Sequence, residues 1–150
     1  MAKLSGERLS KELLKLLAAP DPRAAVRLMR SCGVMEVLWP GPLRFDRFEA
    51  MVPLSTDPAL RLSAILPDEA DTVRKIAARL RLSNALRDRL TAAIEGPRLD
   101  LSSDRAVARA AIYRNGAGAV RDRLMKLWAE QPSLQAVSYT HLTLPTILRV

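Results

Sequence analysis

Residues 5–18, which read SGERLSKELLKLLA, carry the clearest structural signal of the chain. Leucines at positions 9, 13, 16 and 17 follow the i, i+4, i+7, i+8 spacing that places apolar side chains on one face of an α-helix. Ser5 is a residue type favoured at a helix start, because its hydroxyl accepts a hydrogen bond from a free backbone N–H. The stretch therefore predicts an amphipathic helix whose opposite face is basic.

The same kind of pattern recurs along the rest of the chain. Asp-Pro steps at Asp21 and Asp57 predict two more helix starts, and Gly33 predicts a helix end. Further helices are expected over 22–33, 58–66, 68–81, 84–94 with a cap at Ser83, 103–113 with a cap at Ser102 or Ser103, and a last segment that contains Trp128. No useful length of sequence alternates with the period of two that strands require. We therefore expect an all-α fold of seven or eight short helices in an irregular bundle.

The composition is that of an ordinary globular domain, with 49% hydrophobic and 27% charged residues. Aromatic residues make up only 4%, so we expect a core of Leu, Ala, Val, Ile and Met. Cys32 lies in an apolar helical pattern, which predicts a buried thiol rather than a nucleophile. The single cysteine and the lack of a long apolar run lead us to expect a cytoplasmic protein with no membrane partner.

Basic residues outnumber acidic ones, which gives the chain a net charge of +8. Segments 1–30, 71–90 and 104–126 each hold four more basic than acidic side chains, whereas 31–70 is net negative. At helical spacing these side chains line polar faces, from which they can follow a phosphate backbone. The candidate RNA-binding residues are Arg8, Lys11, Lys15, Arg23, Arg27, Arg30, Arg74, Lys75, Arg79 and Arg81, with a fourth basic set at Arg121, Arg123 and Lys126.

A solvated helix face is the alternative explanation for each basic set taken alone. Taken together with the excess charge, the sets leave RNA binding and this alternative evenly balanced. Side chains that could stack on bases are scarce, since Trp39, Tyr113 and Trp128 fall at core-like positions. We therefore expect recognition of the shape and backbone of folded RNA rather than of single-stranded bases.

Residue types for catalysis or metal binding are sparse. Up to residue 136 the chain has one cysteine and no histidine, which excludes the usual clusters of these ligands. Asp68, Glu69 and Asp71 are closely spaced, but we assign them to the first turn of the predicted helix 68–81, where acidic groups complement the helix dipole. We therefore expect no catalytic residue, no metal ligand and no cofactor site within this chain.

Residues 137–150 differ in character from the helical sequence that precedes them. Residues 137–146 read VSYTHLTLPT, which resembles a translated transposase-type sequencing adapter at every codon. We therefore expect 137–150 to be a non-native tail, and His141 within it receives no functional weight. The alternative is a natural β-prone tail, because Thr, Tyr, Ile and Val favour strands.

Several short motifs are distinctive in their order and spacing. They are LSGERL at 4–9, ELLKLL at 12–17, PDP at 20–22, LM at 28–29, CGVM at 32–35, VLWP at 37–40, LRLSN at 80–84, YRNG at 113–116 and RDR at 121–123. Over residues 3–130 this series resembles the bacterial tRNA nucleotidyltransferases, which are the CCA-adding enzymes and their poly(A) polymerase relatives. Trp39 departs from the family pattern, in which an aliphatic residue is usual.

The resemblance implies one part of a larger, four-part enzyme. In that family a catalytic head holds Mg²⁺ on an Asp-x-Asp pair, a neck selects CTP or ATP, and helical regions hold the tRNA. On this basis 1–20 would be the end of the neck helices and 21–136 the helical tRNA-binding body. Glu7, Arg8 and Glu12 match family motif residues, and the resemblance implies that they brace the neck and contact RNA.

We therefore predict that the chain is the tRNA-binding helical portion of a tRNA 3′-end nucleotidyltransferase that adds CCA. The Asp-x-Asp pair and the nucleotide-selecting motif do not occur in the chain. We therefore expect it to be inactive alone, with Mg²⁺ and CTP or ATP implied only for a full-length enzyme. Poly(A) addition stays open for the same reason. The alternative is a free-standing basic helical adaptor that binds RNA or protein.

Overall fold

The structure is a computed structural model that describes residues 5–39, 41–96, 99 and 103–131. Within these residues all regular structure is helical, which confirms the expected all-α class. The helices are α1 (Gly6–Leu17), α2 (Arg23–Ser31), α3 (Val34–Leu38), α4 (Phe45–Met51), α5 (Pro58–Ile65), α6 (Ala70–Arg79), α7 (Asn84–Glu95), α8 (Arg105–Asn115) and α9 (Ala117–Ala129). The described part thus holds more helices than expected, because α3 and α4 are too short to show a full apolar stripe in the sequence.

Helix starts follow the capping residues closely. Three predicted helix starts are confirmed. The side chain of each capping residue accepts a hydrogen bond from a backbone N–H in the first turn of the helix that follows it, and these residues are Ser5, Asp57 and Ser83. The expected cap of α8 at Ser102 or Ser103 is wrong, since Asp104 precedes its first residue, and Ser102 lies outside the described residues. Asp is as good a helix-starting residue as Ser, so the sequence signal was ambiguous at this point.

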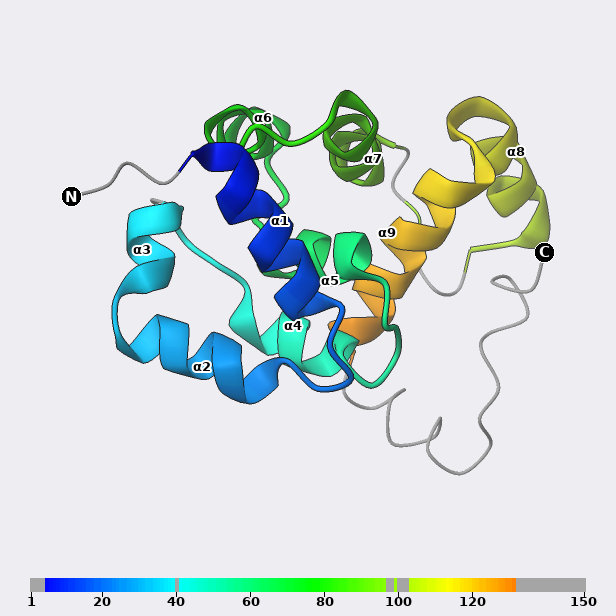
Figure 1. The fold of residues 1–150 in the computed structure, drawn as a ribbon. Helices are drawn as coiled ribbons and strands as arrows, with labels where there is room; N and C mark the ends of the chain where they lie inside the picture. Colours follow the sequence, from blue (N-terminus) through cyan, green and yellow to red (C-terminus); the bar gives the residue numbers. More distant parts are fainter. Residues whose placement is uncertain (1–4, 40, 97–98, 100–102, 132–150) are drawn as a thin grey trace.

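The helix α5 forms the centre of the fold. Residues 59–65 are all buried, and α1, α4, α7 and α9 pack around them (Figure 1). The main core also buries Trp39 and Trp128, as expected. A second, smaller cluster joins α8 to α9 through Ala111, Val120 and Leu124.

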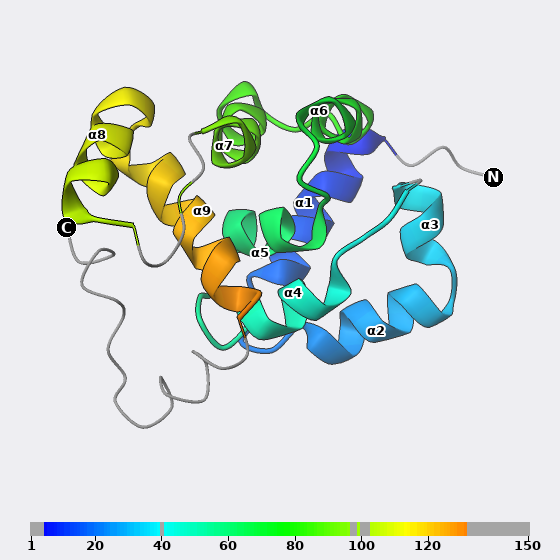
Figure 2. The same cartoon turned by 180° about the vertical axis from the view of Figure 1, so that it is seen from behind.

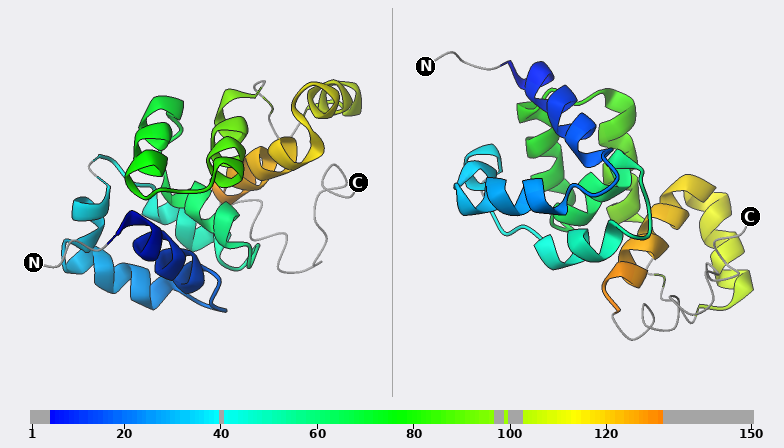
Figure 3. Two further views of the ribbon diagram at one scale, coloured as in Figure 1. Left: turned by 45° about the horizontal axis from the view of Figure 1, so that its top comes forward. Right: turned by 60° about the horizontal axis from the view of Figure 1, so that its bottom comes forward.

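The remaining helices extend the molecule in two directions. α2 and α3 pair with each other at one end, and α8 packs on α9 at the other end (Figures 1 and 3). α6, α7 and α8 lie in a row along one side, as Figure 2 shows from behind. In the described part of the chain, no helix has the length and apolar character needed to cross a bilayer.

The start of α1 lies directly against the end of α6. A Cβ atom placed on Gly6 would lie 2.6 Å from the carbonyl oxygen of Arg79 and 3.4 Å from Cγ of Arg81. Real Cβ atoms do not approach an oxygen this closely, so the contact requires glycine at this position. Gly6 thereby places α1 beside the carboxyl end of α6, which brings two of the predicted basic sets together.

Candidate nucleic-acid interface

The basic set of α1 lies on the exposed face of that helix. Arg8, Lys11 and Lys15 are all exposed, while Leu13 and Leu17 on the opposite face are buried. Among the described residues the three basic side chains have no hydrogen-bond or ion-pair partner. Their charges are therefore available to an anion from solution.

Glu7 and Glu12 border this basic stripe on α1. Both are exposed, and neither side chain is paired within the part of the chain that the structure describes. They would repel a phosphate that approached from their side of the helix. A polyanion is therefore best accommodated along the line of the three basic side chains between them.

The carboxyl half of α6 carries a second group of exposed cations. Lys75, Arg79 and Arg81 are exposed, and no carboxylate of the described residues neutralises them. Arg79 donates to the carbonyl oxygen of Val37 at 2.7 Å, which ties α6 to α3 but leaves its charge uncompensated. Arg81 adopts a positive φ of 49°, and it also lines a groove of about 600 Å³ between α6 and α7.

We call this surface the α1–α6 basic edge. It consists of Arg8, Lys11, Lys15, Lys75, Arg79 and Arg81. The sequence predicted each of these residues, but only the Gly6 contact shows that the start of α1 meets the end of α6. Uncompensated cations on two helices that meet can attract a phosphate backbone.

The basic set of α2 is largely neutralised instead. Arg23 pairs with Asp21 at 2.7 Å, and Arg27 forms a two-pronged ion pair with Glu49 at 2.5 and 2.8 Å. The hydrogen bond from Arg23 holds the pKa of the Asp21 carboxyl at about 2, so this group stays charged at neutral pH. The α2 set therefore adds little free charge to the surface.

Two further predicted residues also have local partners. The guanidinium of Arg30 stacks over the ring of Phe45, 4.4 Å from its centroid, which is a cation–π contact. Arg74 pairs with Asp71 at 2.9 Å and also with Glu95. The hydrogen bond that Arg74 donates to the Glu95 carboxylate raises the pKa of Arg74 above its usual range.

The fourth basic set is not a surface set, which corrects the prediction. Lys126 is buried, and its amine lies 2.5 Å from a carboxylate oxygen of Asp68. Arg123 donates to the carbonyl oxygens of Ile94 and Gly96. Of this set only Arg121 is exposed. The reason is that α9 is enclosed on several sides by α4, α5, α7 and α8, so that little of its surface meets water.

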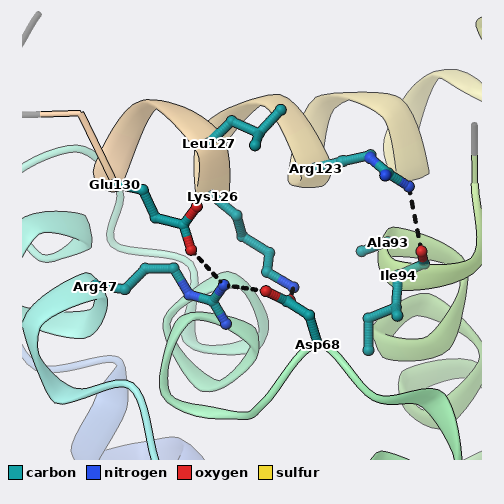
Figure 4. A pocket seen from close by; sticks show the side chains of 8 residues that line it. All are labelled: Arg47, Asp68, Ala93, Ile94, Arg123, Lys126, Leu127 and Glu130. Atoms are coloured by element: carbon teal, nitrogen blue, oxygen red, sulfur yellow. Dashed lines mark hydrogen bonds and ion pairs between the residues drawn. The ribbon is translucent and has the colours of Figure 1, made fainter. Parts of the chain in front are cut away.

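A small polar pocket of about 270 Å³ surrounds Lys126 (Figure 4). The buried Arg47 reaches Asp68 at 2.6 Å and Glu130 at 2.9 Å. Burial lowers the pKa of the Lys126 ammonium, and repulsion from Arg47 adds to this effect. Burial alone would raise the pKa of Asp68, but hydrogen bonds and charge from Arg47 and Lys126 outweigh it and hold this pKa below its usual value.

This pocket is a structural network. Its cations are already paired with carboxylates or carbonyl oxygens of the fold. The sequence analysis expected Asp68 in the first turn of α6, and this is wrong. Asp68 precedes that helix, and it pairs with Arg47 of α4 and Lys126 of α9. Within the described residues, no group of three or more His, Cys, Asp or Glu side chains could hold a metal ion.

Two buried arginines were missed by sequence reasoning. Arg61 is completely buried and donates to carbonyl oxygens after α1 and α4, including those of Leu17 at 2.7 Å and Val52 at 3.0 Å. Arg47 donates in the same way to Ala64 and Leu66 at the end of α5. Arg61 stands between Leu60 and Leu62, and this apolar surrounding is the sequence signal that could have revealed it. Arg47 stands between Asp46 and Phe48 and carries no such signal.

Two expected burials are wrong. Cys32 is exposed, because the buried position of α2 is Val26, and Leu28, four residues before Cys32, is also 63% exposed. Tyr113 is 93% exposed, not core-like. On α8 the buried positions are Ala108 and Ala111, so the tyrosine lies outside the packed face.

Comparison with known families supports an RNA-related assignment for the start of the chain. Residues 1–44 match the family described as "Probable RNA and SrmB- binding site of polymerase A". This segment covers α1 to α3, with the α1 set inside it and the α6 set beyond it. No curated protein and no solved structure matches the chain. The match supports a relationship of this segment with the poly(A) polymerase family.

Proposed function

We propose that the chain binds RNA along the α1–α6 basic edge, as the RNA-holding helical part of a polymerase A-like nucleotidyltransferase. The observation that carries the proposal is the α1 set, whose three exposed cations have no partner in the described structure. The same set lies inside the segment that matches the RNA-binding family model. The family model matches the segment that holds both the α1 and the α2 sets, and the lack of compensation within this segment selects α1.

The physical basis is the contrast between the basic sets. Arg27 and Arg74 are compensated by carboxylates that the fold places beside them. The cations of the α1–α6 basic edge have no carboxylate partner among the described residues, although the chain contains 16 acidic residues. Uncompensated like charges on adjoining helices repel each other and gain most from a polyanion, whose counterions they release.

We further propose that the bound RNA is tRNA and that the reaction served is addition to its 3′ end. This finer proposal rests on the sequence motifs that resemble CCA-adding enzymes, which extend beyond the matched segment to residue 130. The Mg²⁺-binding carboxylates and the CTP or ATP site would belong to a catalytic head outside this chain. Glu7, Arg8 and Glu12 would then lie where neck and RNA meet.

Binding measurements with a pair of matched variants test the RNA proposal. The first replaces Arg8, Lys11 and Lys15 of α1 by Gln, and the second replaces Arg23, Arg27 and Arg30 of α2 by Gln. Both remove three positive charges with little effect on helix propensity. We expect the α1 variant to bind tRNA at least about tenfold more weakly and the α2 variant to lose less than about threefold. Equal losses would contradict a located site and indicate non-specific charge attraction.

The tRNA proposal has its own test. Competition of labelled tRNA with unlabelled tRNA, a plain hairpin and a single-stranded oligonucleotide of equal charge should favour tRNA. Sequencing of the source DNA across both ends of the reading frame provides a second check. An in-frame Asp-x-Asp segment upstream would support the nucleotidyltransferase. A stop codon directly upstream, together with equal competition, would contradict it.

A protein-binding adaptor is the second candidate, and one observation favours it. Leu28 and Val37 are 63% and 68% exposed on α2 and α3, which is unusual for large apolar side chains in neighbouring helices. Replacing both by Ser should abolish binding of a protein partner and leave RNA affinity unchanged. Loss of RNA affinity in this variant would instead extend the RNA surface to α2 and α3.

A further inference from the structure

The most exposed aromatic side chain of the described structure lies on α8. Tyr113 is 93% exposed, and its phenol has no partner among the described residues. Large aromatic side chains normally bury most of their surface, because this burial is their main contribution to stability. α8 therefore carries an apolar ring in water that its own fold does not use.

Two arginines extend the exposed ring into a stripe. Arg105 and Arg109 precede Tyr113 by eight and four residues, so all three lie on one face of the helix at steps of about 6 Å. All three are exposed. α8 packs on α9 through Ala108 and Ala111, which leaves this stripe on the outer side. We call these three residues the α8 stripe.

The charges of the α8 stripe are uncompensated. Neither Arg105 nor Arg109 has an ion-pair partner in the part of the chain that the structure describes. Arg114, the next residue after Tyr113, is also exposed and adds positive charge to this helix. The exposed side chains of Ala106 and Ala110 are too small to cover the stripe. A partner for this surface must be negatively charged and must offer a flat apolar face.

We propose that the α8 stripe binds a single-stranded segment of RNA, with phosphates on Arg105 and Arg109 and one base stacked on Tyr113. Unpaired bases have an accessible π-face, and basic side chains interleaved with aromatic rings are the usual device for binding them. The inference rests on the proposed function, since it assumes that the chain meets RNA. It adds a second contact, because α8 lies at the right end of the molecule and α1 in its left half in Figure 1.

The test uses the full chain, a single-stranded RNA oligonucleotide and an RNA hairpin without unpaired bases beyond its loop. Tyr113→Ala should weaken binding of the single strand at least about fivefold, which is the lower range for loss of one stacked base. Tyr113→Phe keeps the ring face and should bind within about twofold of the unchanged chain. Val107→Ala, an exposed apolar position on the same helix, should have no effect on either RNA.

Any other outcome overturns the inference, and the outcomes show whether the proposed function fails with it. If Tyr113→Ala binds like the unchanged chain while the α1 variant loses affinity, the α8 stripe is not a contact but the proposed function stands. If Tyr113→Phe loses as much as Tyr113→Ala, the hydroxyl and not stacking is responsible. If neither RNA binds, both proposals fail, and loss of a co-purifying protein in Tyr113→Ala would then indicate a protein surface. Circular dichroism checks the fold of every variant.

Discussion

At the scale of single residues, buried arginines connect helix ends that are far apart in the sequence. Arg61 donates to the carbonyl oxygens of Ser55, Leu17, Ala19, Pro20 and Val52. Carbonyl oxygens at the carboxyl end of a helix lack partners within the helix and carry part of the negative end of its dipole. One guanidinium therefore compensates several such groups and holds α1 and α4 against α5.

Replacing Arg61 by Met should destabilise the chain strongly. The thioether is similar in length but leaves the buried carbonyl oxygens without donors, which costs at least about 3 kcal/mol of the free energy of unfolding. Urea denaturation followed by circular dichroism measures this change. Arg27→Met is the matched control, because Arg27 is exposed and paired only with Glu49, and its urea midpoint should stay close to that of the unchanged chain. Similar costs for the two variants would contradict the role of Arg61.

Asp68 has a comparable structural role for two buried cations. Replacing it by Asn leaves Lys126 and Arg47 close together with Glu130 as the remaining anion. We expect a cost of about 2 kcal/mol, below the range for fully buried pairs because Asp68 is 44% exposed. Asp71→Asn, at an 81% exposed side chain, should change stability by less than about 0.5 kcal/mol. An unchanged urea midpoint in the Asp68 variant would be inconsistent with the network.

The contribution of Asp68 should also depend on pH. Its pKa in the folded chain lies below the ordinary value, so the unfolded chain binds its proton first as the pH falls. The stability from its charge is therefore complete above about pH 4 and is lost as the pH falls through the lowered pKa. The difference in urea midpoint between the unchanged chain and Asp68→Asn should shrink below pH 4. A difference that grew on acidification would contradict this sign.

At the scale of helices, the contact at Gly6 fixes how α1 meets α6. Gly6→Ala places a methyl group 2.6 Å from the carbonyl oxygen of Arg79, so one of the two helices must shift. We expect a loss of about 1–3 kcal/mol despite the better helix propensity of Ala. Gly118→Ala is the control, since nothing lies within 4 Å of its Cβ position, and it should be neutral or slightly stabilising. Thermal melting measures the stability of both variants. Equal melting temperatures would refute the close contact at Gly6.

Much at this scale could be predicted from sequence, because the causes are local. A cap and an apolar stripe lie within a few residues of each other, which is why the starts of α1, α5 and α7 were correct. The buried face of α2 was not predicted correctly. Only Val26 on that helix is buried, and the sequence contains several other apolar residues that could have been. α3 and α4 each span seven residues or fewer, too few to define a period.

At the scale of the whole molecule, the fold selects among basic sets that look alike in the sequence. Arg27, Arg74 and Lys126 have neutralising partners that lie 22, 21 and 58 residues away along the chain, and Arg74 also has a local partner, Asp71. No local pattern relates residues at such separations, so the sequence could list candidate cations but could not say which are free. The adjacency of α1 and α6 is likewise a property of the packed structure.

The same argument applies to the exposed tyrosine of α8. Its spacing from apolar neighbours suggested a core position, but the small cluster between α8 and α9 is filled by Ala111, Val120 and Leu124 with Leu99. Tyr113 is exposed because the described part of the fold supplies no neighbour that covers it. The sequence pattern does not say which helices will pack together. The expected tail at 137–150 and the division at residue 136 lie outside the described residues and stay predictions.

The measurement that tests the central claim most directly is the salt dependence of tRNA binding by the unchanged chain and the α1 variant. Each lost phosphate contact should reduce the slope of log affinity against log salt concentration by about 0.7–0.9. We predict a slope smaller by about 2 when Arg8, Lys11 and Lys15 are replaced by Gln, and an almost unchanged slope in the α2 variant. Identical slopes for all three proteins would contradict RNA binding along the α1–α6 basic edge.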